Sequence, residues 1–247
     1  MPDLRGFGQS RALTLSHTCP LTVYADDLAC LAESFSLDKA PLVAISMGAL
    51  SAVRGFELGL GERFARYMHI DQGLAIHNED AGGHGLLGAA QPAFFTRVEA
   101  LLEILARSSV ASYRQLSPAV QRELAAIFAE FASAAFSRDE LNYAVRQIAE
   151  RPGLLPLFLP TAGFATHVQI MRAYLERRYD LRAAFARVPA QTTVLIGGSS
   201  RMYPAAGQRI VSNLRANVRV RELPSVGHLL PLEAPRVFLR ELRTFLA

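Results

Sequence analysis

The stretch Pro41-Leu-Val-Ala-Ile-Ser-Met-Gly48 decides the expected fold, because the apolar residues 41–45 predict a strand and the small residues of 48–58 predict a helix directly after it. Ser46 stands at the turn between the two. A turn of this kind, a nucleophile elbow, lifts a serine hydroxyl clear of the end of a sheet. Ser46 is therefore a candidate nucleophile, although a Ser-x-Gly tripeptide at a strand end is also common without such a role.

Elements with strand and helix patterns alternate on both sides of this stretch. Residues 24–35 have helical spacing, and residues 66–70 predict a second strand that ends at Asp71. Strand patterns return at 191–196 and 217–223, before a closing helix at 235–246. A strand, a helix and a second strand in this order predict parallel strands joined by helical crossovers.

Residues 73–180 have a different pattern, because they are helical almost throughout, most clearly at 94–105 and 119–136. A helical block that interrupts an α/β pattern predicts an inserted cap. We therefore expect residues 1–72 and 181–247 to form the core and residues 73–180 to form a helical cap.

Composition limits the classes of function. The chain has 247 residues, 51% of them hydrophobic, and it lacks both a targeting segment and an apolar run of the roughly 18 to 20 residues that span a bilayer. We expect a cytoplasmic protein with no membrane span. Its net charge is +4, but the arginines are interleaved with Asp and Glu, so no nucleic-acid partner is expected. Cys19 and Cys30 are expected to be reduced thiols.

His228 is the candidate base. It follows the last predicted strand, and the carboxyl ends of parallel strands meet at one edge of a sheet, so His228 is expected near Ser46. The usual position of the acid, in the turn 197–201, holds Ser200. Asp71 can replace it, because it ends the strand next to the elbow strand, roughly 4.8 Å away. A turn or helix cap is the alternative role of Asp71.

Several motifs resemble those of α/β-hydrolases of the esterase and epoxide-hydrolase type. They are Asp3-Leu-Arg-Gly-Phe-Gly-Gln-Ser10, Ser46-Met-Gly48, Ile70-Asp-Gln72, Tyr179-Asp-Leu-Arg182 and Gly227-His228. The resemblance implies an α/β-hydrolase parallel sheet, and the members with a serine at the late acid position imply Asp71 as the acid. A serine nucleophile separates the chain from the haloalkane dehalogenases and epoxide hydrolases, which attack with aspartate.

The same resemblance implies an oxyanion hole. One donor would be the backbone N–H of Met47, which follows the nucleophile. The other normally comes from a His-Gly loop upstream, which the sequence as written does not contain, and the N-terminal strands of the fold are expected to be lacking as well. The strand at 41–45 would then be an exposed sheet edge through which a homo-oligomer could form.

These features predict a serine esterase that cleaves a small to medium apolar ester or thioester through an acyl-enzyme, without a cofactor or a metal. The alternative is a catalytically impaired, hydrolase-like binding protein or a truncated fragment. The substrate pocket is expected to include Phe94, Phe95, Phe158 and Phe164, with further apolar residues at Leu155, Leu157 and Leu159. The polar cluster of His77, Glu79, Asp80 and His84 lacks the spacing of a metal site and predicts a solvated loop.

Overall fold

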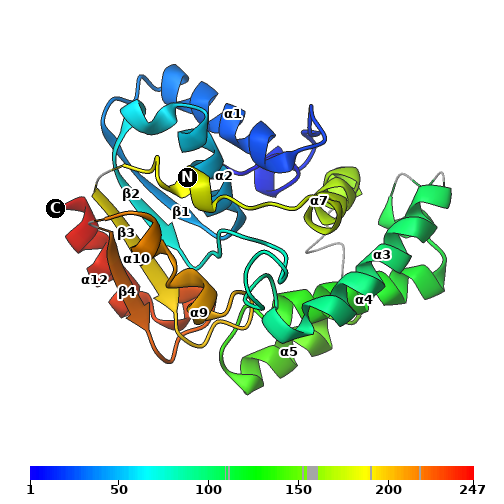
Figure 1. Cartoon of the computed structure of the whole chain (residues 1–247). Coiled ribbons are helices and arrows are strands. Elements are labelled where there is room, and N and C mark those ends of the chain that lie inside the picture. Colours follow the sequence, from blue (N-terminus) through cyan, green and yellow to red (C-terminus); the bar gives the residue numbers. More distant parts are fainter. Residues whose placement is uncertain (109, 111, 152, 155–160, 190, 217) are drawn as a thin grey trace.

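The computed structural model describes residues 1–247 except 109, 111, 152, 155–160, 190 and 217 (Figure 1). The strands are β1 (Ala40–Ile45), β2 (Phe64–Ile70), β3 (Gln191–Gly197) and β4 (Arg219–Leu223). The longer helices are α1 (Pro20–Ser34), α2 (Met47–Glu57), α3 (Gln91–Arg107), α4 (Pro118–Ser133), α5 (Asp139–Ala149), α7 (Phe164–Glu176) and α12 (Pro235–Leu246). The one-turn helices are α8 (Arg182–Phe185), α9 (Ala205–Gln208), α10 (Val211–Leu214) and α11 (Leu230–Glu233).

The four described strands form a parallel sheet in the order β1-β2-β3-β4. Ile45 of β1 lies opposite Ile70 of β2, and Ile70 lies opposite Leu195 of β3. Side chains alternate between the two faces, so Met68 and Ile70 pack with Phe245 of α12, whereas Tyr67 packs on the face covered by α2. This register brings the carboxyl ends of the strands to one edge of the sheet.

β1 is an edge strand of the described sheet, as Figure 1 shows. Val43, at its centre, is 39% exposed. An exposed apolar edge strand is a template for pairing with another chain. Association of copies through β1 stays a prediction.

Most of the longer helices between β2 and β3 lie to one side of the sheet. Figure 1 shows α3, α4 and α5 packed together on the side of the molecule away from α12, with α7 between them and α1. α3 begins at Gln91, three residues before its predicted start, and α4 begins at Pro118, one residue before its predicted start. A proline lies in the first turn of each helix. The division into a core and a cap at 73–180 stays a prediction. Asn217, the predicted start of β4, lies outside the described residues.

Candidate active site at the carboxyl ends of the strands

Ser46 is the first residue after β1, and its backbone is in a conformation that non-glycine residues rarely adopt, with φ 54° and ψ −133°. The Ser46 N–H donates to the carbonyl of Ile70 at 3.1 Å, so the turn is tied to the end of β2. α2 begins at the next residue, Met47, whose N–H has no acceptor within the helix. Such a backbone costs roughly 1 to 3 kcal/mol and is concentrated at functional sites.

Asp71 holds the corresponding position on the neighbouring strand. It is the first residue after β2, it also has a positive φ of 42°, and its N–H donates to the carbonyl of Leu195 at 2.8 Å. Because Ile45 and Ile70 are in register, Ser46 and Asp71 leave the sheet side by side. The positive φ of both residues turns the chain out of the sheet at the same level.

The Asp71 carboxylate is fully buried and accepts four hydrogen bonds. Oδ1 accepts from the Gly197 N–H at 2.6 Å and from Gln208 Nε2 at 2.9 Å. Oδ2 accepts from Ser200 Oγ at 2.6 Å and from His228 Nδ1 at 2.9 Å. A carboxylate accepts hydrogen bonds through both oxygens, so the four donors fix its orientation. They also fix the histidine tautomer, with the proton on Nδ1 and a lone pair on Nε2.

The loop that carries His228 is packed tightly against the end of β3. A Cβ on Gly197 would lie 2.4 Å from the carbonyl oxygen of Gly227, so only glycine allows this approach. Glu233 holds the loop from the other side, because its carboxylate accepts from the N–H groups of Gly227 at 3.1 Å and Ser137 at 2.8 Å. His228 itself is 3% exposed, which makes it a rigid partner for Asp71.

Ser46 and Met47 open into a cavity of about 300 Å³. The hydrogen bonds of the described residues do not include one between Ser46 Oγ and His228. His228 lies next to the cavity wall, because Tyr203 is part of that wall and its ring centroid is 6.4 Å from that of His228. Catalytic hydrogen bonds are often long before a substrate binds, so this geometry is compatible with proton transfer between the two residues.

The cavity wall is almost entirely apolar. Phe94 and Phe95 of α3 line it, and Phe94 stacks on Phe131 of α4 with their ring centroids 6.2 Å apart. Phe164, by contrast, lies in the hydrophobic core at the start of α7 and is not among the described residues of the wall. Phe158 lies outside the described residues, and so do Leu155, Leu157 and Leu159. The other residues of the wall are Phe7, Leu86, Val98, Leu124, Ile127, Phe128, His167, Ile170, Met171, Tyr174, Leu175 and Met202.

Phe7, from the Asp3–Ser10 motif, lines the same cavity as Ser46 and Met47. Its N–H donates to the carbonyl of Leu4 at 3.0 Å, and the Gly6 N–H donates to the carbonyl of Ser10 at 3.1 Å. Neither group is therefore a second oxyanion donor in this conformation. The Met47 N–H stays the predicted donor.

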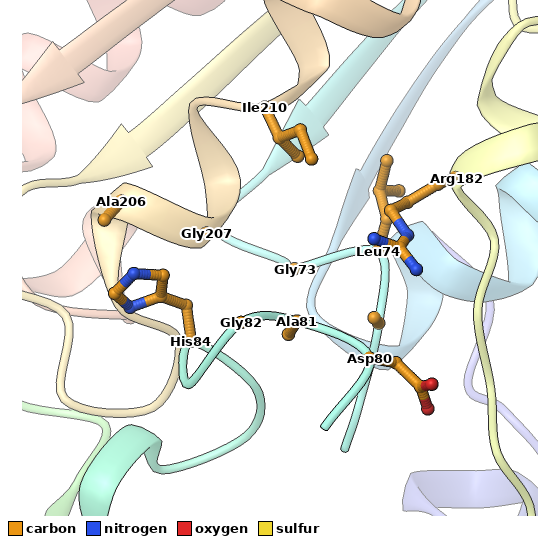
Figure 2. A pocket seen from close by; sticks show the side chains of 11 residues that line it. Gly73, Leu74, Asp80, Ala81, Gly82, His84, Arg182, Ala206, Gly207 and Ile210 are labelled. Atoms are coloured by element: carbon orange, nitrogen blue, oxygen red, sulfur yellow. The ribbon is translucent and has the colours of Figure 1, made fainter. Parts of the chain in front are cut away.

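A second hollow of about 230 Å³ is lined by Gly73, Leu74 and residues of the 80–84 loop, among others (Figure 2). Its charged side chains already have partners, because Asp80 pairs with Arg178 at 2.7 Å and Arg182 pairs with Asp180. Figure 2 shows the Asp80 carboxylate directed away from His84.

Over the described part of the chain, no cluster of three or more possible metal-binding side chains is found, and no helix combines the length and apolarity needed to cross a bilayer. Both cysteines are free thiols.

Two side chains of the site were not singled out from the sequence. Gln208 donates to Asp71 from α9, and nothing in its local sequence marks it. His167 lies in the cavity wall, where burial lowers its pKa.

His69, by contrast, is a structural residue of β2, since its ring nitrogens bind Tyr67 Oη and the Gln72 carbonyl, both at 2.8 Å. Burial lowers the pKa of His69 to about 4.

A family model described as the alpha/beta hydrolase family matches residues 1–241. The chain belongs to the α/β hydrolase family. The fold class predicted from the sequence is thereby confirmed, including the parallel sheet. No curated protein matches the chain.

Solved structures of this family share the fold at low sequence identity. An esterase from Rhodococcus sp. ECU1013 has a TM-score of 0.69 and 19% identity, with 98% of this chain and 78% of that chain covered. A thermophilic esterase from Thermogutta terrifontis has a TM-score of 0.66 and 22% identity, covering 99% and 78%. A putative non-heme bromoperoxidase from Mycobacterium tuberculosis has a TM-score of 0.62 and 20% identity, covering 99% and 79%.

Proposed function

We propose that this α/β hydrolase is a serine hydrolase that cleaves a carboxylic ester or thioester through an acyl-enzyme. The observation that carries the proposal is the buried Asp71–His228 pair, 2.9 Å between Oδ2 and Nδ1, at the strand ends beside the strained turn of Ser46. A nucleophile, a base and an acid that orients the base are the three parts of a catalytic triad.

The first half-reaction forms the acyl-enzyme. His228 Nε2 takes the proton of Ser46 Oγ, which attacks the carbonyl carbon of the ester and makes a tetrahedral oxyanion. The Met47 N–H, free at the start of α2, would donate to that oxyanion. When the intermediate collapses, the bond to the alcohol or thiol breaks, and the leaving group receives the proton from Nε2.

The second half-reaction reverses the roles with water. His228 Nε2 takes a proton from water, the hydroxide attacks the acyl carbon, and the proton returns to Ser46 Oγ as the acid leaves. Through both halves Asp71 would hold the imidazole in one orientation and stabilise the imidazolium. Ser200 and Gln208 are positioning residues in this scheme, because they bind Asp71 and not the substrate.

The cavity supports a small or medium apolar ester. Its volume of about 300 Å³ is at the lower end of the range for small-molecule sites, and aromatic and aliphatic side chains form most of its wall. The esterases of Rhodococcus and Thermogutta among the structural neighbours agree with this substrate class. The mechanism requires no cofactor and no metal.

The first test is hydrolysis of p-nitrophenyl butyrate by Ser46→Ala. We expect turnover to fall by roughly 10⁴- to 10⁶-fold, since the nucleophile is lost. The matched control is Ser51→Ala, one turn further along α2, whose hydroxyl donates to the Met47 carbonyl and does not line the cavity. Undiminished turnover in Ser46→Ala would refute the assignment. Binding of the ester by the wild-type chain without turnover would support the alternative of an impaired, hydrolase-like binding protein.

A further inference from the structure

His167 of α7 is a polar residue of the described cavity wall that has no use in the mechanism above. It is 6% exposed, and neither of its ring nitrogens has a hydrogen-bond partner among the described residues. Other buried polar atoms without a partner belong to Gln72, Gln208 and Arg215, but none of these residues lines the cavity. His167 therefore combines two properties, an unpaired buried polar side chain and a place in the wall of the cavity that holds Ser46.

The ring of His167 is held in place by two neighbours. Phe7 contacts it edge-on, with the ring centroids 4.8 Å apart and the planes at 80°. In addition, a Cβ on Gly163 would lie 3.0 Å from His167 Cε1, so the ring and the backbone are in close contact. A ring that is fixed by packing, and not by hydrogen bonds, holds both buried nitrogens unpaired at a defined position.

An unpaired imidazole in an apolar wall destabilises the fold, whereas a leucine of similar size would not. Burial lowers the pKa of His167, which keeps the ring neutral near pH 7. A neutral imidazole offers one N–H donor and one acceptor nitrogen. No Asp, Glu, Lys or Arg is among the described residues of the wall, so nothing there would compensate a charged ligand group. The group that fits His167 is an uncharged oxygen.

We propose that His167 is a specificity-determining residue that hydrogen-bonds a hydroxyl or ketone oxygen on the substrate, away from the scissile ester. The preferred substrate class is then an oxygenated ester and not a plain alkyl ester. This inference rests on the proposed function, because it takes the cavity beside Ser46 as the substrate site. It refines the expectation of a purely apolar ester, since one position along the acyl chain or the alcohol would be polar.

The test measures binding and not turnover, in the Ser46→Ala background. The reference ligand is ethyl hexanoate. One series carries an oxo or hydroxy group at successive positions of the acyl chain, and a second series carries it in the alcohol part of the ester. We expect at least one oxygenated ester to bind roughly tenfold more tightly than its plain counterpart, although the oxygen must give up water to enter the cavity.

Three further substitutions identify the cause of that preference. His167→Leu should remove it, and His167→Gln, which keeps a donor and an acceptor, should retain part of it. Met171→Leu is the matched control, because it changes the shape of the wall without removing a hydrogen-bonding group, and it should keep the preference. The melting temperature of each variant confirms that it folds.

Equal affinity for every oxygenated ester and its plain counterpart would overturn the proposal, and so would a preference that persists in His167→Leu. Either result leaves the proposed function intact, because labelling of the wild-type serine by a fluorophosphonate probe reports on Ser46 independently. Loss of that labelling with a retained preference would instead refute the hydrolase mechanism and leave a binding site for an oxygenated ligand.

Discussion

Two buried histidines, His228 at the end of the sheet and His167 in the wall of the cavity, differ in what they bind within the chain. His228 has a carboxylate 2.9 Å from Nδ1, and that carboxylate has three further donors. His167 has aromatic and glycine neighbours and no hydrogen-bond partner among the described residues. His228 and Asp71 satisfy each other's hydrogen-bonding groups inside the protein. In our proposal, His167 instead forms its hydrogen bond with the ligand that enters the cavity.

Among the substitutions that test this comparison, Asp71→Asn has the largest expected effect, because it would break the network at its centre. An amide in place of the carboxylate would hold the imidazole in the wrong tautomer and leave its cation without a counter-charge. We expect turnover of p-nitrophenyl butyrate to fall by about 10⁴-fold.

The control for this change is Asp180→Asn, because Asp180 is paired with Arg182 at the surface and not with a histidine. It should leave turnover close to that of the wild type. A fully active Asp71→Asn would instead assign Asp71 a capping role in its turn.

The pH dependence of stability tests the lowered pKa of His69, which lies two residues before Asp71. Both ring nitrogens of His69 are hydrogen-bonded inside the chain. Its pKa falls from 6.5 to about 4 on folding, so between these values the unfolded chain binds more protons than the folded one. Stability therefore decreases as the pH falls from about 6.5 to about 4, by about 3 kcal/mol from this residue. We expect His69→Gln, which keeps a donor for the Gln72 carbonyl, to lose this part of the pH dependence in urea unfolding. An unchanged slope would contradict the shift.

Gln208→Leu sharpens the comparison by removing one of the four donors to Asp71, together with the hydrogen bond from the same amide to the Tyr203 carbonyl at 2.9 Å, and Gln208 itself is not among the described residues of the wall. We expect kcat to fall by roughly tenfold with KM nearly unchanged, since a hydrogen bond to a charged group is worth about 1.5 to 3 kcal/mol and three donors remain. Restoration of kcat by Gln208→Asn, which keeps an amide donor, would support positioning through Asp71. A change in KM alone would place Gln208 in substrate binding instead.

The smallest expected effects are changes in melting temperature, and they have opposite signs at His167 in the cavity wall and at Ser200 beside Asp71. His167→Leu removes an unpaired polar group and should raise the melting temperature by roughly 2 to 4 °C, whereas Ser200→Ala removes a partner of Asp71 and should lower it by a similar amount. Differential scanning calorimetry of both variants gives the comparison directly. A lower melting temperature in His167→Leu would mean that His167 is paired in the folded chain.

The features that were predictable from the sequence are the ones fixed by the backbone. The elbow at Ser46 and the strand end at Asp71 follow from apolar runs that stop abruptly, and the register of β1 and β2 then brings the two residues together. His228 was predictable because it follows the last strand. Gln208 and His167 were not, since a one-turn helix and a helix of ordinary amphipathic pattern carry no local signal of what their side chains face. Phe164 was assigned to the pocket by residue type, and its position at the start of α7 places it in the core.

The most direct test of the central claim is mass spectrometry of the wild-type chain after reaction with a fluorophosphonate probe. The account predicts one adduct per chain, on Ser46, formed rapidly in the wild type and very slowly in Asp71→Asn. An adduct on another serine, or no adduct on a folded chain, would contradict it.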